Sequence, residues 1–136
     1  MTIRNLAIAL LASIALAGCS SSTKNYDVDV SGATTYYFKN PAESVGLQRK
    51  LIEVMTEKGY SLASSEDGAI VFDFSADNNA WGTGRGVLVT YDGQPVMSSE
   101  SSNAGFGTLL LAGSERSRME SNVAGAVSRN IPAISN

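Results

Sequence analysis

Few residues in this sequence belong to the types that most often carry out chemistry in proteins. There is one cysteine, Cys19, and there is no histidine. Without histidine the chain cannot form a Ser-His-Asp or Cys-His nucleophile system, and it offers no imidazole ligand to a metal. A single cysteine cannot form a disulfide within the chain, and zinc or iron–sulfur sites are not expected. Modification of Cys19 is therefore the first chemistry to consider.

The segment before Cys19 has the three parts of a secretory signal peptide. Arg4 supplies a positive charge, the stretch from Leu6 to Leu16 is almost entirely apolar, and the small pair Ala17-Gly18 precedes the cysteine. The apolar run has about 11 residues, whereas a helix that spans a membrane needs about 20. We therefore expect residues 1–18 to be a cleaved signal helix.

The four residues Leu16-Ala17-Gly18-Cys19 resemble the lipobox of bacterial lipoproteins. The resemblance implies that Leu16, Ala17 and Gly18 are recognised as the processing signal. It also implies that Cys19 is diacylated, becomes the new N-terminus and is usually N-acylated as well. Each buried CH₂ contributes roughly 0.8 kcal/mol, and stable anchoring needs at least two chains. The alternative is an ordinary signal peptide with an incidental cysteine.

The residue after Cys19 is Ser20. In enterobacteria-like systems an aspartate at this position tends to retain a lipoprotein in the inner membrane. The resemblance therefore implies a location at the cell outer membrane, facing the periplasm. The periplasmic face of the inner membrane and the cell surface remain alternatives.

The charge balance limits the partners of the mature chain. The whole chain has 10 basic and 13 acidic side chains and a net charge of −3, and Arg4 is the only charged residue before Cys19. The mature chain is therefore more acidic than the precursor. Nucleic-acid binding, which needs a basic patch, is not expected. An acidic domain is also not attracted to an anionic lipid surface, so the lipid must supply the anchoring.

Caps and apolar spacing predict the elements of one α+β domain. Asn40, Pro41 and Glu43 form a capping-box arrangement at the start of a helix, and Lys58-Gly59 followed by Tyr60 suits a Schellman motif at its end. Asp92-Gly93 predicts a hairpin turn. The complete expectation is strands over 33–38, 69–75, 87–91 and 94–101, and helices over 40–58 and 114–131.

This β-α-β-β-β-α order predicts a two-layer sandwich, with a mainly antiparallel sheet and two helices on one face. We expect a signal peptide over 1–18, a lipidated N-terminus with a flexible tether over 19–32, a single domain over 33–132 and a C-terminal tail over 133–136. The tether prediction rests on the Ser-rich run that follows Cys19.

A second resemblance rests on the pattern from Leu51 to Phe74, together with the final helix that runs into Ile131-Pro132. In that stretch a helix leads into Lys58-Gly59-Tyr60, an acidic-Gly turn and an apolar strand. The pattern over residues 34–132 resembles small envelope lipoproteins of the type grouped as domain of unknown function 4136. The resemblance implies a fold and a compartment, and no activity.

The stretch from Asp77 to Gly86 is predicted to be a loop between strands. Its run Gly82-Thr83-Gly84-Arg85-Gly86 lacks the Lys-Ser/Thr ending and the following helix of a phosphate-binding loop. Trp81 and Arg85 are the candidate residues of an exposed contact tip, because aromatic and arginine side chains are enriched at interfaces. The run Ala104–Leu111 is expected either to be core or to form an exposed apolar docking patch.

The expected function is that of a lipid-anchored envelope protein with a structural or protein-binding role, without catalysis, cofactor or metal. The partners would be the membrane, through Cys19, and an envelope protein. One alternative is a small-ligand or glycan-binding module that uses Trp81, Arg85 and Tyr36-Tyr37. A weaker one is a hydrolase that uses Asp73 and Asp77 as acid and base. The charges of Glu115, Arg116, Arg118 and Glu120 are expected on a solvated helix face.

Overall fold

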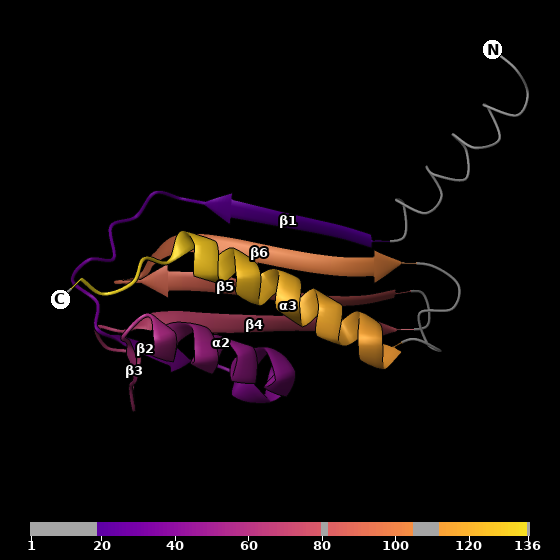
Figure 1. The fold of residues 1–136 in the computed structure, drawn as a ribbon, viewed down its shortest axis with the longest axis horizontal. Coiled ribbons are helices and arrows are strands. Elements are labelled where there is room, and N and C mark those ends of the chain that lie inside the picture. Colours follow the sequence, from indigo (N-terminus) through magenta and orange to yellow (C-terminus); the bar gives the residue numbers. More distant parts are fainter. Residues whose placement is uncertain (1–18, 80–81, 105–111, 136) are drawn as a thin grey trace, which may run out of the picture.

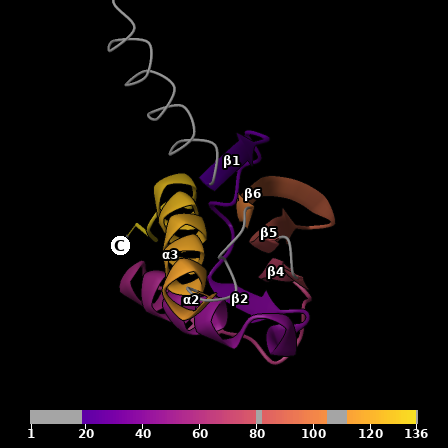
Figure 2. The same ribbon diagram turned by 90° about the vertical axis from the view of Figure 1, so that its right-hand side faces the viewer.

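The computed structural model describes residues 19–79, 82–104 and 112–135, which fold into two layers. One layer is a six-stranded sheet. Helices α2 (Val45–Glu57) and α3 (Ala112–Asn130) lie side by side on one face of this sheet (Figure 1, Figure 2). The prediction of an α+β two-layer sandwich is confirmed. The expected signal helix lies outside the described residues.

The sheet is mainly antiparallel, as predicted. β2 is parallel to β3 and β4, because α2 carries the chain back to the starting end of β2 before β3 and β4 begin. The other neighbouring strands are antiparallel. The strands are β1 (Cys19–Asn25), β2 (Thr35–Phe38), β3 (Ser61–Leu62), β4 (Ile70–Asn79), β5 (Gly82–Tyr91) and β6 (Gln94–Ala104), in the order β1-β6-β5-β4-β2-β3.

The hairpin between β5 and β6 turns where the sequence predicts it. Tyr91 pairs with Gln94, and the two residues between them have positive φ values, 53° at Asp92 and 76° at Gly93. This is the backbone of a type I′ turn, which matches the twist of the two strands and favours Asp-Gly.

The hairpin between β4 and β5 is longer than the sequence predicts. The expectation of a loop from Asp77 to Gly86 is wrong, because the antiparallel ladder continues until Asn79 pairs with Gly82. Glycine is a weak strand former, so the sequence gives no local signal here. Here backbone pairing with two neighbouring strands overrides the local preference.

The expected flexible tether is also not found. Residues 19–25 form β1, which pairs along its whole length with β6, from Cys19 opposite Asn103 to Asn25 opposite Met97. Residues 20–25 have no alternation of apolar side chains that would predict a strand, because all of them are polar. Backbone hydrogen bonds to β6 hold it, and these do not depend on side-chain type. β1 is therefore an edge strand of the sheet.

The first helix begins later than predicted. Pro41–Glu43 form a short 3₁₀ helix, and α2 starts at Val45 with Ser44 as its cap. Asn40 makes no side-chain capping bond. Instead its Nδ2 donates to the carbonyl oxygen of Phe74 at 2.7 Å, and its Oδ1 accepts from the Phe74 amide at 2.7 Å. The capping-box prediction is wrong, and Asn40 joins the end of β2 to β4.

The end of α2 follows the prediction. Gly59 has a φ of 96°, the amide of Gly59 donates to the Thr56 carbonyl at 3.0 Å, and the amide of Tyr60 donates to the Met55 carbonyl at 3.0 Å. This pair of bonds defines a Schellman motif, in which glycine tolerates the left-handed backbone.

The core lies between the helices and the sheet. Phe38 of β2 contacts Phe72 and Phe74 of β4, with ring centroids 5.6 and 5.4 Å apart. The predicted apolar face of the last helix is buried as expected, although α3 begins at Ala112, before the predicted cap Ser114. Its buried residues are Met119, Val123, Ala126 and Val127, with Ile131 directly after the helix. Except for Met119, these residues belong to one core cluster with Leu47, Leu51 and Met55 of α2 and Ile70, Val87, Val89 and Met97 of the sheet.

Candidate functional site

The predicted lipid-attachment residue lies at one end of the sheet. Cys19 is the first residue of β1, where its backbone is paired with Asn103 near the end of β6. The signal residues Leu16, Ala17 and Gly18 lie outside the described residues. Lipidation therefore stays a prediction from the sequence, and the structure adds where on the domain the lipid would be attached.

Arg85, the other candidate site residue inside the described ranges, is not at an exposed tip. It lies in β5 on the same sheet face as Val87 and Val89, and only 5% of its surface is exposed. One guanidinium nitrogen, Nη1, donates to the carbonyl oxygen of Gly84 at 2.7 Å. The prediction of an exposed Arg85 contact is wrong, and Trp81 lies outside the described residues.

The helix-facing side of the sheet becomes polar toward the Cys19 end. Along β5 the buried residues change from Val89 and Val87 to Arg85, and along β6 they change from Met97 to Ser99 and Ser101. Asn122 of α3 lies over this region, with its Nδ2 3.4 Å from the Ser101 hydroxyl. Among the residues that the structure describes, the apolar core therefore ends before the sheet does.

Arg85 has a buried acidic neighbour on α3. Burial lowers the pKa of Arg85, the positive charge of Arg116 lowers it further, and the negative charge of Glu120 opposes both effects. Glu120 is itself 6% exposed, which corrects the expectation of a solvated position. A Cβ at Gly46 would overlap its carboxylate. Glu120 therefore lies between α2 and α3, where glycine leaves room for it.

A helical projection could have found Glu120. It follows Met119 and precedes Val123 and Ala124 by one turn, so it lies within the apolar stripe of α3. Arg116 and Arg118 are exposed, as predicted. The burial of Arg85 could have been predicted from its spacing, because Arg85, Val87 and Val89 lie on the same face of a strand. That prediction requires the glycine-rich segment to be recognised as a strand first.

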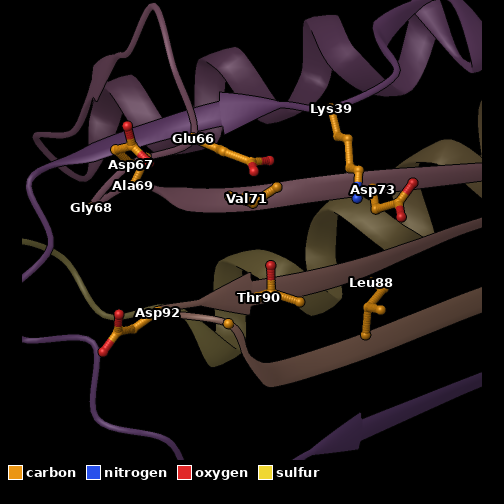
Figure 3. Close-up of a pocket in the computed structure, with 11 residues that line it drawn as sticks. Lys39, Glu66, Asp67, Gly68, Ala69, Val71, Asp73, Leu88, Thr90 and Asp92 are labelled. Atoms are coloured by element: carbon orange, nitrogen blue, oxygen red, sulfur yellow. The ribbon is translucent and has the colours of Figure 1, made fainter.

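No helix of the described residues lies over the opposite face of the sheet (Figure 2). A groove of about 400 Å³ runs along this face, beside β4 and β5 (Figure 3). Lys39, Asp73 and Leu88 lie at one end of the groove, where the apolar side chain of Leu88 is 39% exposed. Glu66, Asp67 and Asp92 lie toward the end where β4 begins and β5 ends. The groove is thus mainly acidic.

The geometry does not favour the predicted pair of catalytic carboxylates. Asp73 and Asp77 are four residues apart on one strand, so their Cα atoms are about 13 Å apart. Glycosidases place their two carboxyl groups roughly 5 to 9.5 Å apart. Within the described residues, no three cysteine, aspartate or glutamate side chains are grouped as a metal site would require.

The aromatic strand of the predicted ligand module is divided between the two faces of the sheet. Tyr36 is 2% exposed in the core, where it contacts Phe38 and Phe72 edge-on. Tyr37 is half-buried and points the other way. Tyr36 and Arg85 therefore do not provide a surface for a ligand, and Tyr37 is the part of the predicted module that reaches the outer face.

Searches for related proteins identify a fold but no family. No family model and no curated protein matches the chain. The chain is similar in structure to PelC from Paraburkholderia phytofirmans, which was solved as a dodecamer: the TM-score is 0.54, identity is 10%, and the match covers 87% of this chain and 99% of PelC. The predicted likeness to the domain of unknown function 4136 stays a prediction.

Two further solved structures are similar. A PDZ domain protein from Parabacteroides distasonis matches with a TM-score of 0.59 and 10% identity, over 83% of this chain and 38% of that protein. A minor lipoprotein from Acinetobacter baumannii matches with a TM-score of 0.48 and 12% identity, over 76% of this chain and 97% of that chain. At these identities the two matches with TM-scores above 0.5, PelC and the PDZ domain protein, show a shared fold. No helix within the described ranges is long and apolar enough to cross a membrane.

Proposed function

We propose that this chain is a bacterial envelope lipoprotein, anchored through lipid on Cys19 to the outer membrane and facing the periplasm. The observation that carries the proposal is the run Leu16-Ala17-Gly18-Cys19 after a short apolar segment, with Cys19 as the one cysteine of the chain. Two or more acyl chains would hold the domain at the membrane. They are needed because an acidic domain is not attracted electrostatically to an anionic lipid surface.

The folded domain then acts by binding and not by catalysis. The sequence contains no histidine, and its cysteine is used for anchoring. The strand spacing of Asp73 and Asp77 does not suit a carboxylate pair for sugar hydrolysis. The groove on the outer face is lined mainly by acidic side chains and has one exposed leucine, Leu88, at one end. A surface of this kind supports a structural or protein-binding role.

A second copy of the chain is the first partner to test. PelC, which shares the fold, forms a dodecamer. The two surfaces of this chain also differ in charge: Asp73 and Glu100 lie on the outer sheet face, whereas from residue 116 onward the exposed charged residues of α3 are Arg116, Arg118 and Arg129. Head-to-tail packing of the sheet face of one copy on α3 of the next would pair these charges, and such contacts form a ring when the rotation between successive copies closes.

The anchor is tested by expressing Cys19→Ser and a matched variant, Ser21→Ala, in bacteria supplied with labelled palmitate. The proposal predicts that Ser21→Ala incorporates the label and fractionates with membranes. Cys19→Ser should incorporate none and should remain an unprocessed precursor. Normal size and membrane fractionation of Cys19→Ser would overturn the anchor.

The choice of membrane is tested by Ser20→Asp. If the outer-membrane rule applies, this change should move the lipoprotein from the outer to the inner membrane fraction in a sucrose gradient, while Ser20→Ala should leave it in place. An inner-membrane position of the unmodified protein would contradict the outer-membrane part of the proposal and leave the anchor standing.

Self-association is tested by measuring the mass of the detergent-solubilised protein. The proposal predicts an oligomer that dissociates when Arg116 and Arg118 are replaced by glutamate. It should also dissociate when Asp73 and Glu100 are replaced by lysine, and it should re-form when the two double variants are mixed. Glu57→Lys, an exposed reversal outside both surfaces, is the control. A monomeric wild-type protein would exclude the second copy as partner.

A further inference from the structure

The lipid-attachment residue and the ends of the longest strands lie at the same end of the domain. Cys19 is paired with Asn103, and Ala104 with Gly82, the residue at which β5 begins. Figure 1 shows this end at the start of β1 and the tip of the β6 arrow. The Asp92-Gly93 turn lies at the opposite end, about 30 Å away along the ten residues of β5.

No flexible segment separates Cys19 from the folded domain. The ladder with β6 starts at Cys19 itself. Side chains reinforce it: the Ser20 and Ser102 hydroxyl oxygens are 2.9 Å apart, and Asn25 Nδ2 donates to Asn130 Oδ1 at 2.7 Å. Beyond β1, Val30 is buried in the core. A loose tether of 14 residues would by contrast allow an end-to-end distance of about 20 Å.

Acidic side chains gather at the end opposite Cys19. The Asn25–Asn130 bond fixes the direction of α3, whose last residue lies beside the end of β1, so that its first turns lie toward the Cys19 end. Arg116 and Arg118 are exposed in this first half. The far end carries the exposed acidic residues that follow β1, precede β4 and form the β5–β6 turn: Asp27, Asp29, Glu66, Asp67 and Asp92. Two exposed basic residues, Lys24 and Arg129, lie near the ends of β1 and α3 on this side.

We propose that pairing of β1 with β6 fixes the domain end-on to the lipid surface, with the Cys19 end of the sheet at the membrane and the acidic end away from it. This inference rests on the lipid anchor proposed above. An anionic lipid surface attracts Arg116 and Arg118 and repels the five acidic residues, which outnumber the exposed Lys24 and Arg129 on their side of the domain, so the balance of charge favours the orientation that β1 imposes. The anchored domain therefore presents its β5–β6 turn outward.

Matched pairs of labels on the full lipidated protein test this orientation. Ser117 and Ser128 are exposed serines in α3, about 16 Å apart along the helix axis. Ser102 and Gln94 are exposed residues of β6, about 27 Å apart. Each is replaced in turn by cysteine and labelled with a fluorophore, because a lipidated Cys19 does not compete for the label.

The protein is reconstituted in vesicles of phosphatidylethanolamine and phosphatidylglycerol that carry a headgroup-attached quencher. We expect labels at 102 and 117 to lose most of their emission and labels at 94 and 128 to keep it. A Gly-Ser insert of about ten residues between Cys19 and Ser20 restores a loose tether and should remove the difference within each pair.

Equal quenching within both pairs, or stronger quenching at 94 and 128, would overturn the orientation. A difference that survives the insert would overturn the role of β1. Failure of the protein to float with the vesicles would instead contradict the lipid anchor, so the two proposals fail in distinguishable ways.

Discussion

Replacing Asn40 separates two accounts of how the start of the first helical segment is stabilised. In the sequence pattern Asn40 is a helix cap, and in the structure its amide group bridges to both the amide and the carbonyl of Phe74, each at 2.7 Å. Phe74 lies in the core and is 4% exposed, so water does not readily replace these bonds. Asn40→Ala removes both.

The size of the effect follows from the two lost bonds. Each hydrogen bond contributes about 1 kcal/mol, and a buried backbone group left without a partner costs about 1 to 3 kcal/mol. Because the site is only partly buried, we expect Asn40→Ala to lower the free energy of unfolding by about 2 to 3 kcal/mol. For a domain of this size that corresponds to a fall in Tm of roughly 10 °C.

Serine and aspartate are the informative replacements. Both cap helices about as well as asparagine, so a capping role predicts almost no loss for either. Ionised aspartate has no donor, and serine has one oxygen on a shorter side chain in place of the two amide atoms that bridge to Phe74. The structure therefore predicts that Asn40→Ser loses nearly as much as Asn40→Ala. Urea unfolding of residues 19–136 with Cys19→Ser, followed by circular dichroism, measures the difference. Wild-type stability of Asn40→Ser would refute the bridge.

Two further predictions concern buried polar side chains. Glu120→Ala removes the carboxylate that opposes the repulsion between Arg85 and Arg116, and it should lower the free energy of unfolding by about 3 kcal/mol. The control Ser117→Ala, on the exposed side of α3, should change the free energy of unfolding by less than about 0.5 kcal/mol. Equal urea midpoints for the two variants would contradict this prediction. The Tyr60 hydroxyl donates to the Pro132 carbonyl at 2.8 Å, and burial raises the pKa of Tyr60. Because the folded state holds this proton more tightly, its contribution is complete below about pH 10 and is lost as the pH rises further. Tyr60→Phe should therefore cost about 1 kcal/mol at neutral pH and should weaken the loss of stability above pH 10; identical pH profiles of unfolding for wild type and variant would show that Tyr60 does not contribute.

The sequence identified those parts of the fold that have a local cause. Gly59 ends α2 because its backbone needs a positive φ, and Asp92-Gly93 makes the hairpin turn that type I′ geometry requires. The alternation of Ile70, Phe72 and Phe74 predicted the buried face of β4. In each of these cases residue type and spacing are enough.

The parts that the sequence missed are held by partners distant in the chain. β1 and the glycine-rich start of β5 are strands because β6 supplies backbone partners, and no local preference signals this. Asn40 looked like a cap because its partner, Phe74, is 34 residues away. Arg85 was assigned to a surface because the segment was expected to be a loop. For the candidate site the sequence provided Cys19, and the structure added its place at one end of the sheet.

The mass of the intact protein purified from bacterial membranes tests the central claim most directly. The lipid-anchor account predicts a chain that begins at Cys19 and carries a diacylglyceryl group, with or without an additional acyl chain on its amine. A chain cleaved at another residue, or one that begins at Cys19 with a free thiol, would contradict it.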